Sequence, residues 1–312
     1  MSRVAIVFTG GTIATVPNAA AGGNTPVLDG AAILALAPGL SEIADVDPID
    51  WGLVPASHLR FAQLIAIASL LDEQLARDEI DGAIVVQGTD TMEETAFAFH
   101  LLVRSHKPVA VSGAMRDSTS AEFDGARNLV AAARWATSGD STEMGVVVVM
   151  GGRVLAADDA VKTHPTAMDT FQSRSGRPLG GARNRLPSVP SAAVEDVHLV
   201  TAVTGMDGSL LRELARARPS GLVVAATGSG NTSADLLEAA TELMSEGTVV
   251  ALTTRCPTGE AAPTYAFPGG GVTWQRAGAL VSTLDGPRTR VALALGLGAG
   301  LDRTGLQQLI GP

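Results

Sequence analysis

The sequence predicts an α/β protein of two domains, each built around a parallel sheet. Apolar runs rich in Val and Ile alternate along the chain with segments of helical period. These runs lack the alternation of a half-exposed strand, which is typical of parallel strands covered by helices on both faces. A chain of 312 residues with 46% hydrophobic content can bury a large core, and its length favours two domains.

The expected strands share a short, β-branched, apolar composition. They are residues 4–8, 83–86, 109–112, 146–150, 199–203, 222–226 and 249–253. Helical patterns fall between them, at residues 30–37, 58–77, 92–104, 124–135, 210–217 and 233–245. This order of strands and helices indicates βαβ units.

A break in the pattern predicts the domain boundary. From Thr163 to Asp196 the chain is rich in Ser, Arg, Gly and Pro, and a new series of strands and helices begins near Val197. We therefore expect a larger domain over residues 1–190 and a smaller one over 197–312.

Composition excludes several classes of function. The net charge of −10 argues against a nucleic-acid surface, because phosphate binding needs clustered Lys and Arg. No run approaches the roughly 18 apolar residues that a membrane span needs, and the first apolar run enters a glycine turn directly, unlike a signal peptide. We expect a cytoplasmic protein with a small-molecule partner, without nucleic-acid or membrane partners.

Cysteine and histidine give no sign of a disulfide or a metal site. Cys256 is the single cysteine, so no internal disulfide can form, and we expect it to be a small core-type residue. The five histidines have no spacing typical of metal ligands.

Two segments that follow expected strands carry the chemistry. They are Thr9-Gly10-Gly11-Thr12-Ile13-Ala14 and Gly88-Thr89-Asp90-Thr91-Met92-Glu93-Glu94-Thr95-Ala96. Each presents a threonine hydroxyl and turn amides at the carboxyl end of a strand, where open α/β sheets bind ligands. Two threonines presented in this way indicate nucleophilic chemistry.

Simpler interpretations of these residues stay open. Asp90, followed by Glu93 at capping-box spacing, is also suited to capping a helix that starts at Thr91. The Gly10-Gly11 pair could be only a tight turn, and Lys162 only a surface lysine. The glycine pair matches neither a phosphate loop nor a dinucleotide fingerprint, so we expect no nucleotide and no other cofactor.

The two segments, in this order with three shorter ones, resemble the bacterial-type L-asparaginase and glutaminase-asparaginase family. The shorter ones are Lys107-Pro108-Val109, Gly113-Ala114-Met115-Arg116 and Pro178-Leu179-Gly180. The resemblance covers nearly the whole chain. It implies an amidohydrolase that converts L-asparagine to L-aspartate and ammonia, with a smaller flavodoxin-like C-terminal domain. It also implies a homo-oligomer, a dimer or a tetramer built as a dimer of dimers.

The resemblance also implies a role for individual residues. Thr12 matches the primary nucleophile, and Thr89, Asp90 and Lys162 match a second catalytic cluster, while Ser57 matches the serine that binds the substrate α-carboxylate. Hydrolysis of an amide benefits from covalent catalysis by a hydroxyl. Lys162 can help only if it is deprotonated part of the time, which burial could favour. Thr89 would then relay its proton.

Further expected contacts concern the substrate. Backbone amides at Gly11 and Gly88 are suited to stabilising the oxyanion, since glycine lets the backbone approach the reacting carbon. Asp90 would bind the substrate ammonium. Asn231 resembles an asparagine that the family contributes across a subunit interface, and residues 260–271 offer no clear match to the acidic residue of a neighbouring subunit.

Two departures from the family pattern concern the pocket. The glycine-rich segment 16–26, which we expect to be a mobile lid, lacks the family's tyrosine, and Tyr265 is the only tyrosine of the chain. Thr25, Asn24, another residue or water would take that role, or activity would be low. His58 stands where the family has glutamine. It could contact the substrate, or be a polar residue at a helix start.

These departures leave other functions open. The chain could be a noncatalytic amino-acid-binding or sensing protein of the same fold, or an amidase for a related amino-acid amide. A subunit of a tRNA-dependent amidotransferase is disfavoured, because the chain starts directly at the catalytic strand and is acidic.

Overall fold

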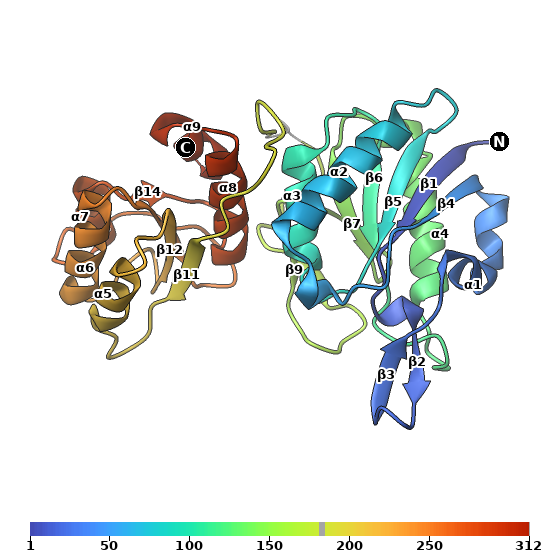
Figure 1. The fold of residues 1–312 in the computed structure, drawn as a ribbon, viewed down its shortest axis with the longest axis horizontal. Helices are drawn as coiled ribbons and strands as arrows, with labels where there is room; N and C mark the ends of the chain where they lie inside the picture. Colours follow the sequence, from blue (N-terminus) through green and yellow to red (C-terminus); the bar gives the residue numbers. More distant parts are fainter. Residues whose placement is uncertain (181–184, 312) are drawn as a thin grey trace. The chain divides into compact units, whose positions relative to one another are not determined.

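The computed structural model describes residues 1–180 and 185–311. The chain divides into two compact units, Met1–Arg185 and Leu186–Pro312. Each unit has a sheet and a hydrophobic core of its own (Figure 1). The α/β fold with two parallel sheets, predicted from the sequence, is confirmed.

The first unit is organised around a six-stranded sheet of order β4-β1-β5-β6-β7-β8. The first five strands of this order are parallel, and β8 pairs antiparallel with β7. Their bounds are Asp45–Asp50 (β4), Arg3–Phe8 (β1), Gly82–Val86 (β5), Val109–Ser112 (β6), Val146–Met150 (β7) and Arg153–Ala156 (β8).

The order of these strands determines where a ligand can bind. Leaving out the hairpin strands β2 and β3, the five parallel strands follow the flavodoxin order, in which the direction of strand addition reverses beside β1. The switch point therefore lies between β1 and β5. Ligands of open α/β sheets bind at the carboxyl ends of the strands at such a point, and these two strands lead into the two threonine segments.

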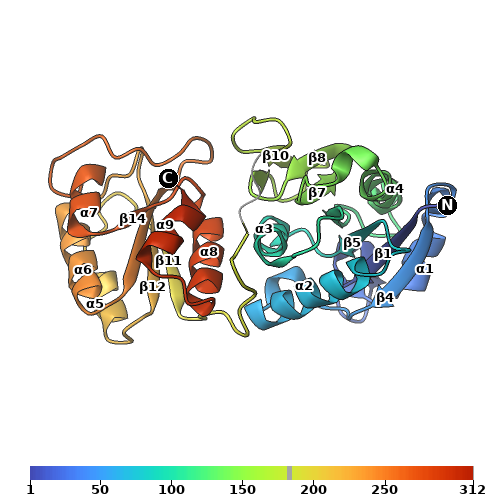
Figure 2. The same cartoon turned by 90° about the horizontal axis from the view of Figure 1, so that it is seen from above.

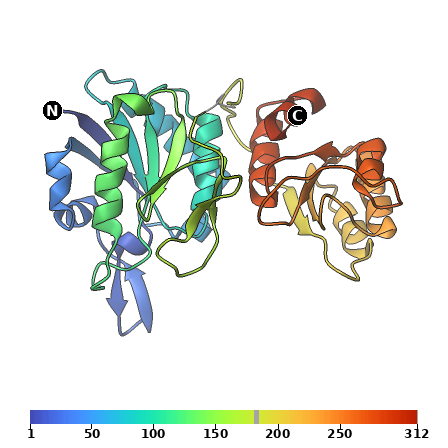
Figure 3. The ribbon, with the colours of Figure 1, turned by 180° about the vertical axis from the view of Figure 1, so that it is seen from behind.

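Helices cover both faces of this sheet. Figure 1 shows α2 (Phe61–Leu75) and α3 (Met92–Leu102) over one face, and Figure 3, from behind, shows α4 (Gly125–Ala136) over the other, where α1 (Gly30–Ala35) also packs. In β1, Val4 and Ile6 belong to the core formed with α1 and α4, while Ala5 and Val7, which alternate with them along the strand, are equally buried. Burial of both faces explains why the strands show no alternation.

The second unit has a parallel sheet of order β11-β12-β13-β14 between helices (Figure 2). Its strands are Val197–Thr201 (β11), Gly221–Ala226 (β12), Val249–Thr254 (β13) and Leu280–Val281 (β14). Its helices are Ser209–Ala215 (α5), Ala234–Ser245 (α6), Gly271–Ala277 (α7), Gly286–Gly298 (α8) and Arg303–Ile310 (α9). We predicted a flavodoxin-like domain here. The parallel α/β sheet is present, but its strands follow chain order, and the flavodoxin order belongs to the first unit.

Some boundaries differ from the prediction for local reasons. The strand expected at 199–203 is Val197–Thr201, two residues earlier. The helix expected from His58 begins at Phe61, because the Gln63 side chain accepts a hydrogen bond from the backbone amide of Arg60 (2.9 Å) and so fixes the helix start. Strand β4 was not predicted. Its sequence holds three aspartates and Pro48, which a strand tolerates only at the edge of a sheet.

Candidate active site

The turns that follow β1 and β5 touch each other. The backbone amide of Thr9 donates to the carbonyl of Val86 (2.9 Å), which ties the ends of the two strands together. Beyond them Gly11 has a φ of +94°, and a Cβ atom built on it would lie 2.2 Å from the backbone nitrogen of Gly88. Only glycine permits this approach. The structure thus places the Thr12 and Thr89 segments side by side at the switch point of the sheet.

Lys162 joins this group from a separate strand. It ends β9 (Ala160–Lys162), which pairs antiparallel with β10 (Phe171–Ser173). Its Nζ donates to Thr89 Oγ1 (2.9 Å) and to Asp90 Oδ1 (3.0 Å). The Lys162 side chain is only 13% exposed, so the interpretation as a solvated surface lysine is wrong. An ammonium and a hydroxyl held at this distance can exchange a proton directly.

Asp90 does not cap the following helix, and this part of the prediction is wrong. Helix α3 begins at Met92 with Thr91 as its N-cap residue, so Asp90 lies one position too early. Its carboxylate, 72% exposed, pairs with Lys162 instead. The capping-box partner is also engaged elsewhere, because Glu93 Oε2 accepts a hydrogen bond from the backbone amide of Lys162 (2.6 Å). Asp90 and Glu93, whose spacing suggested a capping box, therefore both bind Lys162 of β9.

Ser57 and His58 lie beside the Thr89 turn. Both are exposed in a 3-10 turn over Ala56–His58, ahead of α2, so the interpretation of His58 as the start of that helix is wrong. Ala56 packs on Gly88, since a Cβ built on Gly88 would lie 3.0 Å from the Ala56 methyl. The Thr91 hydroxyl donates to the Ala56 carbonyl (2.9 Å) and holds this turn in place.

The expected lid is an antiparallel hairpin of β2 (Thr15–Asn18) and β3 (Gly23–Pro26). Asn24 Nδ2 donates to Asp117 Oδ2 (3.3 Å), and Thr25 Oγ1 accepts from Asn18 Nδ2 (3.4 Å). Both residues considered as replacements for the family's tyrosine therefore bond to the hairpin or to the loop after β6.

Asn231 is the one candidate residue that belongs to the second unit. It follows β12 in an irregular turn, and its Oδ1 accepts a hydrogen bond from the backbone amide of Gly271 (3.3 Å). Tyr265 is half-exposed in the same unit, with its ring 5.7 Å from that of Phe267. All other candidates, Gly11, Thr12, Ser57, His58, Gly88, Thr89, Asp90 and Lys162, lie in the first unit.

Sequence reasoning missed the residues that hold this group together. Gln87, 1% exposed, donates to Thr95 Oγ1 (2.6 Å) and to the Gly88 carbonyl (3.3 Å), so it links β5 to α3 and fixes the Thr89 turn. Thr91 and Thr95, one helical turn apart, and Glu93 between them face three different neighbours. The sequence signal that could have indicated these contacts is the concentration of hydrogen-bonding side chains within residues 91–95.

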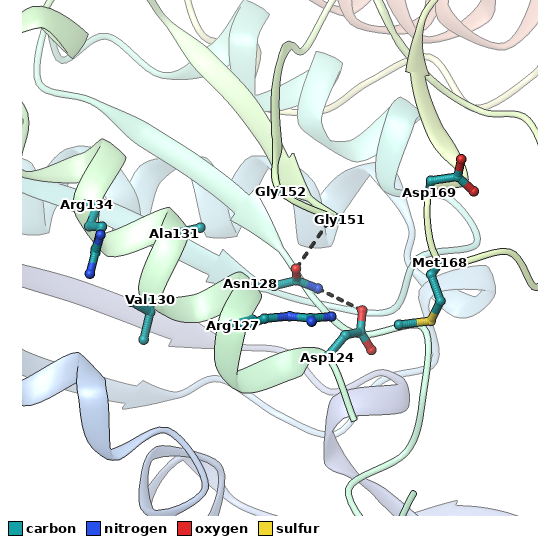
Figure 4. A pocket seen from close by; sticks show the side chains of 10 residues that line it. All are labelled: Asp124, Arg127, Asn128, Val130, Ala131, Arg134, Gly151, Gly152, Met168 and Asp169. Carbon is teal, nitrogen blue, oxygen red and sulfur yellow. Dashed lines mark hydrogen bonds between the residues drawn. The ribbon is translucent and has the colours of Figure 1, made fainter. Parts of the chain in front are cut away.

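A separate cavity of about 510 Å³ lies between α4 and the turn that joins β7 to β8 (Figure 4). Asp124, which lines it, accepts hydrogen bonds from the backbone amides of Met115 and Arg116 (both 3.0 Å) and from Asn128 Nδ2 (2.9 Å). This buried carboxylate thus holds the segment Gly113-Ala114-Met115-Arg116 against α4. None of the candidate site residues lines this cavity.

The described residues offer no cluster of three or more His, Cys, Asp or Glu side chains that could hold a metal ion. In the same part of the chain, no helix has both the length and the apolar character needed to cross a membrane.

Two family models together match nearly the whole chain. The family model for the asparaginase N-terminal domain matches residues 3–193, and the model for the glutaminase/asparaginase C-terminal domain matches residues 196–310. The chain belongs to the asparaginase family. Relatives named L-asparaginase match it over 50% to 97% of their own length.

A protein named "Probable L-asparaginase" from Deinococcus radiodurans is 33% identical, over 99% of this chain and 97% of its own. A "Probable L-asparaginase periplasmic" from Haemophilus influenzae is 29% identical, over 99% and 92%. A "Glutaminase-asparaginase" from Acinetobacter glutaminasificans is 28% identical, over 74% and 76%.

Proposed function

We propose that this asparaginase-family protein hydrolyses L-asparagine to L-aspartate and ammonia, with Thr12 as the nucleophile. The observation that carries the proposal is the contact of Gly11 with Gly88, which brings Thr12 beside the Thr89, Asp90 and Lys162 cluster. A binding protein has no need for two hydroxyls and a largely buried lysine at one point.

The proposed reaction has two halves. In the first, Thr12 Oγ1 attacks the side-chain amide carbon of the substrate, its proton passes to the pair of Thr89 and Lys162, and an acyl ester forms as ammonia leaves. Lys162 already donates to the Thr89 hydroxyl, so a proton can pass through Thr89 to the leaving nitrogen. In the second half, water attacks the ester, the same pair takes the proton of that water, and a proton returns from the pair to Thr12 Oγ1 as L-aspartate leaves. Backbone amides of the two glycine turns stabilise the oxyanion in both halves.

The polar rim of this site would bind the ends of the amino acid. The exposed Asp90 carboxylate has acceptor capacity left for the substrate ammonium beside its bond to Lys162. Ser57, held beside Gly88 through Ala56, would donate to the α-carboxylate. We assign His58 to the same rim, because it shares the turn of Ser57. Asn231 would contribute from a second copy of the chain, in a homodimer or homotetramer.

Ammonia release from L-asparagine, L-glutamine and D-asparagine tests the proposal, with Thr12→Ala and Thr89→Val as variants. We expect release from L-asparagine by the wild type, and loss of about a hundredfold or more in kcat for each variant, the usual scale for removing a catalytic hydroxyl or an oxyanion-hole donor. Circular dichroism spectra and melting temperatures like the wild type would show that both variants fold. Wild-type rates in either variant would contradict the assigned roles.

A noncatalytic binding protein is the second candidate, favoured by the engagement of Asn24 and Thr25 away from Thr12. For this function, ammonia release would be absent at high protein concentration while L-asparagine or L-aspartate still raised the melting temperature. The cytoplasmic location also stays a prediction, since one relative is named periplasmic. Cell fractionation tests it.

A further inference from the structure

We propose that Glu93 is a positioning residue that holds Lys162 in reach of Thr89. The inference rests on the proposed function for its catalytic consequence. It concerns a residue that belongs to the threonine segment but has no part in the two half-reactions. Glu93 lies in the first turn of α3, half-buried, and its Oε2 accepts a hydrogen bond of 2.6 Å from the backbone amide of Lys162.

The direction of this bond follows from the pairing of β9 with β10. Thr163 donates its backbone amide to the Thr170 carbonyl (2.8 Å), so it faces β10. Successive residues of an antiparallel pair face their partner strand and the opposite side in turn. Lys162, one residue earlier, therefore directs its backbone amide away from β10, toward α3. Glu93 accepts at a position that a neighbouring strand would otherwise occupy.

The bond completes a connection between two parts of the site. The side chain of Lys162 reaches Thr89 and Asp90, just before α3, and its backbone is bound to Glu93 in the same helix. Lys162 is thus attached to this segment at both ends, over 69 residues of sequence. Strand β9 has three residues and, among the described residues, pairs with β10, so the Glu93 bond provides a backbone link to α3 that strand pairing does not supply.

Loss of the Glu93 bond should affect chemistry more than binding. Without it the β9 backbone can move away from α3, and the Lys162 ammonium no longer stays at hydrogen-bond distance from Thr89. A displacement of about 1 Å can cost a hundredfold in rate, so we expect Glu93→Ala to lower kcat by about tenfold or more. KM should change by less than about threefold, because Asp90 and Ser57 keep their places.

The conservative variant separates geometry from charge. In Glu93→Gln the side-chain amide oxygen can still accept from the Lys162 amide, while the negative charge is gone. We expect kcat of Glu93→Gln within about threefold of the wild type, since a neutral acceptor makes a weaker but equally directed bond. A Glu93→Gln variant as slow as Glu93→Ala would show that charge matters, and would overturn the positioning role.

Asp72 provides the matched control. It is a half-buried carboxylate in α2 that accepts from the backbone amides of Arg104 (2.8 Å) and Ser105 (2.9 Å), past the other end of α3. Asp72→Ala removes carboxylate–amide bonds of the same kind without touching Lys162. We expect it to lower the melting temperature with kcat unchanged. An equal loss of kcat in Asp72→Ala and Glu93→Ala would mean that Glu93 acts only through stability.

Hydrogen exchange reports on the bond between Glu93 and the Lys162 amide independently of enzymatic activity. In a peptide covering residues 160–163, we expect faster exchange at Lys162 in Glu93→Ala than in the wild type, and near-wild-type exchange in Glu93→Gln. Unchanged exchange in Glu93→Ala would overturn the proposal. If the wild type released no ammonia from any amide, the proposed function would fail, while this exchange result would still decide whether Glu93 holds Lys162.

Discussion

Gly11 is the residue on which the contact between the two turns depends. With a φ of +94° and Gly88 directly against it, a methyl group at this position meets both backbone strain and a steric clash. We expect Gly11→Ala to force the turns apart, at a cost of about 1 to 3 kcal/mol as for other overpacked sites. Ammonia release should fall sharply, because Thr12 moves away from Thr89. Activity and chemical denaturation of the variant measure both effects.

Gly22 is the control for Gly11. It also has a positive φ of +68°, but a Cβ built there meets nothing within 4 Å. Gly22→Ala therefore carries the backbone strain alone, at the tip of the hairpin. If Gly22→Ala lost as much activity as Gly11→Ala, strain rather than the contact of the turns would be responsible.

A second prediction about a single residue concerns Lys162. Lys162→Met keeps most of the side-chain volume and removes both bonds, to Thr89 and to Asp90. We expect turnover of L-asparagine to stop at neutral pH, because no proton donor remains beside Thr89. L-Aspartate should still raise the melting temperature, since Asp90 is freed for the ligand ammonium. Rapid turnover with an unchanged pH profile would contradict the proton relay.

Candidate site residues could be named from the sequence, and their contacts could not. Thr12, Thr89, Asp90 and Lys162 were named because their segments resemble those of the asparaginase family, and their roles stay predictions. The capping role of Asp90 was wrong, because capping-box spacing is local while its partner Lys162 lies 72 residues away. The bond of Glu93 to Lys162 escaped prediction for the same reason, since the spacing of Glu93 had already been explained as a cap.

At the scale of elements, the hairpin of β2 and β3 is bound to the loop after β6 through Asp117. The hydroxyl and then the backbone amide of Thr119 hold the pKa of Asp117 below that of an ordinary carboxyl, and Asn24 lowers it further. Asp117→Ala removes the partner of Asn24. We expect faster hydrogen exchange over residues 15–26, because the hairpin loses its bond to this loop. If the hairpin acts as the lid expected from the sequence, the KM for L-asparagine should also rise.

The pKa of Asp117 sets the sign of a pH dependence. A carboxyl whose pKa is lower in the folded state contributes stability above its unfolded pKa, and loses it as pH falls through the folded pKa. The melting temperature of the wild type should thus exceed that of Asp117→Ala at neutral pH, and the difference should close in acid. A difference that persisted below the folded pKa would contradict this.

Asp207 is the matched control for Asp117. In the second unit it accepts from Ser209 Oγ (2.6 Å) and from the Ser209 amide (3.0 Å), the same turn geometry as Asp117 with Thr119, and its pKa is lowered for the same reason. Asp207→Ala should lose stability in the same pH range without faster exchange in the hairpin. Faster exchange there would mean that the effect is not specific to the Asn24 contact.

Elements with strong apolar character were predictable, and edge elements were not. Strands β1, β5, β6 and β7 are buried on both faces, so composition alone marks them. Strand β9 has three residues and depends on β10 and Glu93 for its place, which no local pattern contains. The hairpin is rich in glycine and polar residues, so it was expected as a lid without any strand.

At the scale of the whole molecule, the order of the strands within a sheet cannot be predicted from composition or from hydrophobic periodicity. The alternation of strands and helices predicted two parallel sheets, but many orders satisfy such a pattern. The flavodoxin order places β1 beside β5 and so makes neighbours of two turns that lie about eighty residues apart in the chain. The Thr12 and Thr89 turns therefore meet at the switch point because of the strand order of the whole sheet.

The proposed homo-oligomer gives a prediction of its own. If Asn231 of one copy completes the site around Thr12 of another, Thr12→Ala and Asn231→Ala remove parts of a shared site that lie on different copies. Each variant alone should be nearly inactive. After the two are unfolded and refolded together, some sites would combine an intact Thr12 with an intact Asn231 from the partner copy, so partial activity should return.

The size of the recovery follows from random mixing. In a dimer, half of the molecules pair one variant with the other, and each mixed dimer holds one intact site out of two, so about a quarter of wild-type activity is the expected limit for independent sites. Light scattering must first show an oligomer, and Thr12→Ala mixed with Thr89→Val is the control, because these residues share one copy and should recover nothing. Full activity of Asn231→Ala by itself would exclude Asn231 from the site, and recovery in the control would place Thr12 and Thr89 in different sites.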